Sequence, residues 1–334
     1  MSGFDRFYGT HFHGWRGWRG RAPAPSALAA RFFVIAVRVA VAISVFWIAG
    51  IGASSRAPAD DAPKPLLWRI DGARPSYLFG TIHLPDDRVV DLPAAVETAL
   101  RDADVIYTEV ALEGAVAAEL AQAMLLPGRE TLQTVLPESL YARVEATLAR
   151  AGLPMLVFGK LEVWAVAAQL VLLDDPSRLG KPPLDQTLVA RAKQSGKETR
   201  TLETPDVQIR AMQSVGREAW IRMLGETLDQ MDEARSRGTT VLDEIIDTYL
   251  AGDLEKLREA AFATTDVSRP DTRKLMKALL TDRNVGMAQT IAERIRAEGD
   301  RAHFFAVGAL HYAGDAGLVS LLREKGLKIE RVAR

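Results

Sequence analysis

Apolar residues recur along the chain at two spacings, which predict strands in some stretches and helices in others. Two short apolar runs, 66–70 and 76–82, flank the Asp-Gly-Ala-Arg-Pro stretch 71–75, which is typical of a hairpin turn. A stretch that opens on proline then predicts a helix over 93–102, and a strand follows over 103–108. Strand, helix and strand therefore alternate as in a βαβ unit.

Residues 112–280 are dominated by apolar positions three and four apart, as at Leu140, Val144 and Leu148, a spacing typical of amphipathic helices. One predicted strand, 198–202, interrupts them. The remaining predicted elements are a helix over 285–297, a strand over 303–307, a helix over 316–324 and a strand over 327–332. The pattern predicts an α/β fold: a central mixed, partly parallel β-sheet with flanking helices and a large helical insertion.

The N-terminal region is basic and precedes a long apolar segment. Residues 1–31 carry five arginines against the single acid Asp5, and residues 32–53 are apolar apart from Arg38 and Ser44. We therefore expect 1–31 to be a cytoplasmic tail and 32–53 to insert in the cytoplasmic membrane as a transmembrane anchor or a signal segment. An apolar core counted from residue 39 favours a cleaved signal, whereas counting from residue 32 favours a retained anchor.

A short linker is expected between this segment and the folded part. Residues 54–64 contain Pro58, Pro63 and paired aspartates, and the predicted domain occupies 65–334. Because positive flanks stay in the cytoplasm, we expect the domain at the periplasmic face of the inner membrane, or free in the periplasm after cleavage.

Composition narrows the chemistry that this chain can perform. Hydrophobic residues make up 48% of the 334 positions, as a packed core requires, and the net charge is −1. The near-neutral balance gives no indication of a nucleic-acid surface or of a polyanionic substrate. The chain has no cysteine, which excludes thiol nucleophiles, disulfides and thiolate metal ligands.

Only three histidines follow the apolar segment, and two of them lie where predicted strands end. His83 follows strand 76–82, His311 lies just past strand 303–307, and both stand three positions after a glycine. Glu109 directly ends strand 103–108, and Glu203 ends 198–202 as a fourth candidate. The carboxyl ends of neighbouring parallel strands share one sheet edge, so we expect these side chains to converge if the strands are neighbours.

Two imidazoles and a carboxylate suit a divalent ion of the zinc, manganese or iron class. Glu109 then serves as a third ligand or stands back as the base that takes a proton from bound water. The alternative is that His83 and His311 only cap or brace their strands. His303 begins its strand, away from this edge, and is expected to be structural.

Several sequence blocks resemble the TraB/GumN/Tiki family. The main ones are Tyr-Leu-Phe-Gly-Thr-Ile-His at 77–83, Asp-Val-Ile-Tyr-Thr-Glu at 104–109 and Val-Gly-Ala-Leu-His at 307–311, in the family's order and spacing. Supporting similarity lies at 127–132, 202–204, 249–254 and 283–284. At 183–185 the chain has Pro-Leu-Asp where similar proteins place glycine two residues before the aspartate, which leaves the role of Asp185 open.

The resemblance implies a function as well as a fold. Tiki-type members are membrane-associated metal-dependent proteases whose paired Gly-x-x-His motifs and acidic residue are taken as the active site. Related folds include erythromycin esterases and a haem-binding lipoprotein, GumN-type members are linked to polysaccharide gene clusters, and TraB-type members act in pheromone shutdown. By resemblance, His83, His311 and Glu109 are the catalytic or metal-binding residues, with Arg283 and Glu203 in support and a Mn, Zn or Co ion as cofactor.

Arg283 also has a physical case of its own. A guanidinium beside a metal site can hold a substrate carboxylate or stabilise an oxyanion, although the same residue can simply brace a loop. From the motifs and the resemblance together we predict an exported metal-dependent hydrolase with a peptide or small-molecule substrate, peptidase-like by resemblance. The alternative is a non-catalytic envelope protein that binds haem, a metabolite or a metal, or that assists polysaccharide production.

Overall fold

The computed structural model describes residues 65–332 except 112, 179 and 263–265. The expected tail, apolar segment and linker, 1–31, 32–53 and 54–64, lie outside the described residues. Among the residues that are described, none of the helices has the length and apolar character needed to cross a bilayer.

Six strands form one mixed sheet in the order β4-β3-β5-β2-β1-β6. The strands are β1 (Leu67–Ile70), β2 (Ser76–Thr81), β3 (Val105–Thr108), β4 (Glu198–Thr201), β5 (His303–Gly308) and β6 (Ile329–Arg331). Neighbouring pairs from β4 to β2 are parallel, whereas β1 runs antiparallel to both β2 and β6. Each expected strand is therefore present within two or three residues of its predicted bounds, and the sheet is mixed and partly parallel as predicted.

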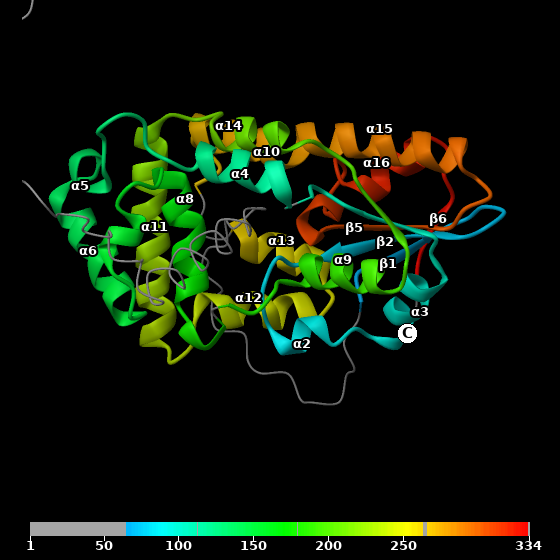
Figure 1. Cartoon of the computed structure of the whole chain (residues 1–334), viewed down its shortest axis with the longest axis horizontal. Coiled ribbons are helices and arrows are strands. Elements are labelled where there is room, and N and C mark those ends of the chain that lie inside the picture. The colour runs from blue at the N-terminus through cyan, green and yellow to red at the C-terminus, as the bar shows by residue number, and fades with distance from the viewer. Residues whose placement is uncertain (1–64, 112, 179, 263–265, 333–334) are drawn as a thin grey trace, which may run out of the picture.

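Helices cover both faces of the sheet. In Figure 1, α15 (Asp282–Ala297) and α16 (Leu318–Glu324) lie on one side of the strands, and α3 (Ala94–Asp102) and α9 (Leu184–Gln194) lie on the other. Every residue of β3 and β5 is buried, which explains why these strands are near-continuous apolar runs.

Most of the other described residues form the expected helical insertion beside the sheet (Figure 1). Its helices are α4 (Gly114–Ala123), α5 (Leu132–Val135), α6 (Glu138–Arg150), α7 (Met155–Phe158), α8 (Val163–Leu170), α10 (Pro205–Met212), α11 (Arg217–Ser236), α12 (Val241–Leu250), α13 (Leu254–Phe262) and α14 (Pro270–Met276). Shorter turns are α2 (Asp87–Val90), η1 (Val171–Leu173), η2 (Pro176–Arg178), η3 (Lys277–Thr281) and η4 (Ala309–Tyr312).

The buried residues of the insertion and of the sheet belong to one hydrophobic core. Phe158 and Trp164 are buried, as expected of core residues. The Tyr249 hydroxyl of α12 donates to the Gly80 carbonyl of β2 over 2.8 Å, so α12 is fixed beside the carboxyl end of that strand.

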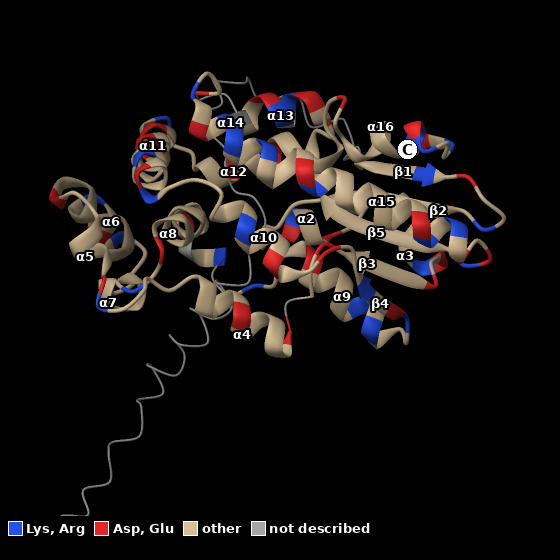
Figure 2. Ribbon diagram, turned by 90° about the horizontal axis from the view of Figure 1, so that it is seen from above, with Lys and Arg blue, Asp and Glu red and all other residues tan. Residues whose placement is uncertain are grey.

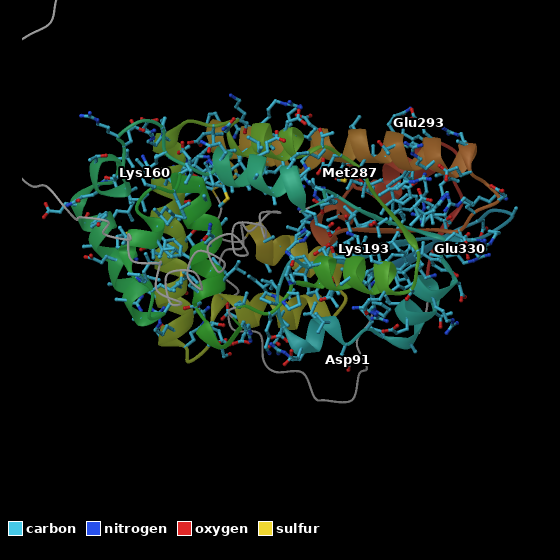
Figure 3. The ribbon with its side chains drawn as sticks, in the orientation of Figure 1. Asp91, Lys160, Lys193, Met287, Glu293 and Glu330 are labelled. Atoms are coloured by element: carbon cyan, nitrogen blue, oxygen red, sulfur yellow. The ribbon has the colours of Figure 1, made fainter. Side chains whose placement is uncertain are left out.

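Charged side chains lie mainly at the periphery of both parts. Figure 3 shows Lys160 on the helical part and Glu293 and Glu330 on the part that contains the sheet, and all three are exposed. Basic and acidic residues are interspersed over the described elements in Figure 2, in keeping with the small net charge of the chain.

Candidate active site at the carboxyl ends of three strands

His83, Glu109 and His311 come together at one edge of the sheet, as the parallel arrangement of their strands requires. β5 lies between β2 and β3 and is parallel to both, and the last residue of β2, Thr81, pairs with Gly308. His83 Nε2 lies 3.5 Å from Glu109 Oε1, and His311 Nε2 lies 3.9 Å from the same oxygen. The expected convergence of these three side chains is therefore observed.

Gly308 leaves open the space in which the three side chains meet. A Cβ atom at this position would lie 3.1 Å from Glu109 Oε1, 3.3 Å from His83 Nε2 and 3.5 Å from His311 Cδ2. The Gly308 N–H donates to Glu109 Oε1 over 2.7 Å, which orients that oxygen. The glycine of this Gly-x-x-His motif is thus part of the site.

The glycine of the first motif serves packing instead. A Cβ atom on Gly80 would lie 2.9 Å from the Cβ of Leu66, closer than real Cβ atoms approach. Glycine therefore lets β2 lie close to the start of the domain.

Each of the two imidazoles also contacts a neighbouring side chain through its Nδ1 atom. His83 Nδ1 lies 2.5 Å from Asp185 Oδ2, and the other oxygen of Asp185 accepts a hydrogen bond of 2.7 Å from Thr81 Oγ1. His311 Nδ1 lies 2.6 Å from Asn284 Oδ1. Asp185, whose role the sequence left open, therefore contacts the site directly from the first turn of α9.

The second oxygen of Glu109 belongs to a buried charge cluster. Arg283 Nη2 donates to Glu109 Oε2 over 2.5 Å and also to Glu203 Oε1, while Gln208 Nε2 donates to both carboxylates over 3.2 and 3.0 Å. Arg283 Nη1 donates to the Leu279 carbonyl over 3.1 Å. Glu203, which was expected as a metal ligand, therefore bonds to Arg283 and Gln208 in this structure. Arg283 donates to two carboxylates, those of Glu109 and Glu203.

The surroundings of the two histidines shift their pKa values in opposite directions. Burial alone lowers the pKa of His83, but the Asp185 carboxylate, aided by Glu109, outweighs it and raises that pKa to about 10. Burial, reinforced by the Arg283 guanidinium, lowers the pKa of His311 to about 3. At ordinary pH His311 is therefore a neutral imidazole, whereas His83 is protonated in the metal-free site and would have to release a proton to bind an ion.

Arg283 decides the charge of Glu109. Burial alone raises the pKa of this carboxyl, but the Arg283 guanidinium, with His83, holds it well below its usual range. Burial raises the pKa of Glu203, and the neighbouring Glu109 adds to that effect against Arg283. Glu109 is thus kept ionised in a buried position.

A divalent ion fits the residues that meet beside Gly308. His311 Nε2 is buried without a hydrogen-bond partner among the described residues, which leaves an electron pair free for an ion. Two ligands of one tetrahedral zinc ion lie roughly 3.4 Å apart, given zinc–nitrogen and zinc–oxygen bonds near 2.1 Å. The separations of 3.5 and 3.9 Å are slightly wider, and within the described ranges no three His, Asp or Glu side chains already stand as a closed ligand set. Binding of one ion by all three residues would require these side chains to move closer together.

Of the side chains at this site, those of His83 and Asp185 are the more exposed. The side chains of His83 and Asp185 are each 13% exposed, whereas those of Glu109, His311 and Arg283 are 3% exposed or less. A substrate therefore has to approach over the His83 ring.

His303 lies away from this site, in keeping with its expected structural role. It begins β5, is fully buried and packs edge-on against Tyr107 with ring centroids 5.8 Å apart. Sequence reasoning missed Gln208 and the contact of Asn284. In the sequence, Asn284 was indicated only by its position next to Arg283. No local pattern indicated that Gln208 contacts the site.

A mixed α/β sheet that gathers two histidines and a glutamate at the ends of adjacent parallel strands defines an α/β protein with a candidate metal centre. The chain belongs to the TraB/PrgY/gumN family, whose model matches residues 66–331.

The chain is also similar to curated proteins, among them two that are named metalloproteases. It is 27% identical to Metalloprotease TIKI2 of Danio rerio, over 79% of this chain and 60% of the relative, and 26% identical to human Metalloprotease TIKI1, over 82% and 63%. It is also 23% identical to the Uncharacterized protein YbaP of Shigella flexneri, over 84% of this chain and 98% of that protein. The chain thus spans less than two thirds of the metalloproteases. No solved structure gives a significant match.

Proposed function

We propose that this domain is a metal-dependent hydrolase of peptides whose site consists of His83, His311 and Glu109. The observation that carries the proposal is the convergence of two Nε2 atoms and Glu109 Oε1 on the space beside Gly308. One of those nitrogens, His311 Nε2, is buried and has no hydrogen-bond partner among the described residues. The similarity to proteins named metalloproteases supports peptides as the substrate class.

His83 and His311 would hold the ion, with Glu109 as third ligand or as the neighbouring base. A divalent ion bound there would polarise a peptide carbonyl and acidify a water molecule. Glu109, kept ionised at this site, would be the base that accepts a proton from water through its Oε1 atom.

Several neighbouring residues keep these groups in place. Arg283 and Gln208 hold Oε2 of Glu109 and leave Oε1 turned toward the histidines. Asp185 holds the His83 ring from its Nδ1 side. We therefore assign Arg283 to positioning Glu109, because both of its carboxylate partners already occupy its donors.

Metal-dependent peptide hydrolysis by the full-length protein tests this proposal. We expect cleavage of a mixed set of unstructured peptides with added Zn²⁺, Mn²⁺ or Co²⁺, its loss on chelation and its return when the ion is restored. Cleavage that survives complete chelation, or no cleavage with any of these ions, contradicts the proposal.

Binding without turnover is the second candidate, favoured by the burial of Glu109 and His311. A ligand-, haem- or metal-binding envelope protein, including one associated with polysaccharide production, would keep its ligand through repeated peptide additions. Stoichiometric ion binding without any hydrolysis would favour this candidate over the hydrolase.

We propose that the domain acts outside the cytoplasm, at the inner membrane or in the periplasm. The support is the arginine-rich stretch 1–31 before the apolar residues 32–53. A reporter enzyme that works only after export, fused behind Arg334, is expected to be active, and the matching cytoplasmic reporter inactive. The reverse pattern would refute export.

A further inference from the structure

Asn284 makes two hydrogen bonds that together determine which nitrogen of His311 carries a proton. The residue lies in the first turn of α15 and is 2% exposed. Its Nδ2 donates to the Ala316 carbonyl over 2.8 Å, and its Oδ1 lies 2.6 Å from His311 Nδ1.

The orientation of this amide follows from the carbonyl. A backbone carbonyl can only accept, so the amide nitrogen of Asn284 must face Ala316 and its oxygen must face the imidazole. An amide oxygen pairs only with an N–H group, so Nδ1 of His311 must carry the hydrogen. A flipped amide would instead bring two oxygens together at Ala316.

The other nitrogen of the ring is then left with its lone pair. His311 Nε2 is buried, has no hydrogen-bond partner within the described part of the chain and lies 3.9 Å from Glu109 Oε1. In the opposite tautomer, a hydrogen on Nε2 would point into the space beside Gly308, where an ion could not approach the nitrogen.

We propose that Asn284 is a positioning residue that fixes His311 as its Nδ1–H tautomer and thereby presents Nε2 as a lone-pair donor to a divalent cation. The cation rests on the proposed function, whereas the tautomer rests on the contacts of Asn284 alone. Amide, rather than carboxylate, suits this place because it can donate to Ala316 and accept from His311 at once.

Nitrogen NMR of the metal-free, full-length protein tests the tautomer directly. With ¹⁵N in its five histidines, and His311 assigned from the signal lost in His311→Gln, we expect the Nδ1–H tautomer in the wild type. Asn284→Leu removes the acceptor and is expected to shift His311 to Nε2–H. Asn284→Asp keeps an acceptor and should retain Nδ1–H even if the Ala316 contact makes it less stable.

Titration with Zn²⁺ and with Mn²⁺ tests the consequence for binding. Loss of such an outer partner typically weakens metal affinity about 10–100-fold, so we expect a loss of this size in Asn284→Leu. The matched control is Gln169→Leu, which removes another buried amide, in α8, and should bind ions as the wild type does.

The outcomes separate this inference from the proposed function. Nε2–H in the wild type, or wild-type tautomer and affinity in Asn284→Leu, overturns the role of Asn284. A tautomer switch in Asn284→Leu with no ion bound even by the wild type supports that role and counts against the metal site.

Discussion

Replacing Arg283 by leucine is expected to destabilise the domain by about 3–5 kcal/mol, the usual cost of removing one partner from a buried ion pair. The guanidinium is 2% exposed and bonds to Glu109 and Glu203, so its loss leaves two carboxylates buried without their cation. Thermal unfolding followed by circular dichroism should show a midpoint lower by roughly 10 °C. Because Arg283 holds the pKa of Glu109 low, the deficit should shrink as the pH falls and the carboxyls take up protons.

Arg200→Leu is the matched control for this variant. Arg200 also bonds to two glutamates, Glu198 and Glu298, but its side chain is 27% exposed and theirs are 43% and 21% exposed. Solvent screens such pairs, so the expected loss is at most about 1 kcal/mol. Equal losses in the two variants would show that the Arg283 cluster is no more than a surface-type ion pair.

His83→Ala and His311→Ala are each expected to abolish metal-dependent peptide hydrolysis. Each variant removes one of the two imidazoles that face Glu109 Oε1, so the effect should exceed the roughly 10–100-fold cost of losing an outer-shell partner. Initial rates at saturating ion, compared with the wild type, measure the loss.

His303→Ala is the control for these two variants. It removes a fully buried imidazole from the opposite end of β5, so it tests the effect of a cavity without touching the site. We expect reduced stability with metal-dependent hydrolysis retained. Equal loss of activity in all three histidine variants would assign the effect to folding and not to the site.

The strands and the edge that carries the site could be predicted from the sequence. Buried parallel strands are continuous apolar runs with turn residues at their ends, so the strands that end near Thr81, Thr108 and Gly308 were evident from local pattern alone. Glu109 and the two Gly-x-x-His motifs stand immediately beyond those ends, and the strand-end rule was enough to bring them together.

The partners of these side chains could not be predicted, because they depend on how the helices pack against the strand ends. Asp185 reaches His83 from α9, Gln208 reaches Glu109 from α10, and Asn284 reaches His311 from α15. No local pattern encodes which side chains of a helix meet the end of a strand once the two elements pack together. For the same reason the sequence did not reveal that Glu203 and Arg283 bind each other.

Metal analysis of the full-length wild type beside His83→Ala and His311→Ala tests the central claim most directly. The claim is that two histidines far apart in the sequence share one ion with Glu109 nearby. We predict that, after reconstitution and removal of loosely held ions, elemental analysis finds close to one divalent ion per wild-type chain and almost none in either variant. Equal and negligible metal in all three proteins would contradict the account and leave the paired Gly-x-x-His motifs as structural turns.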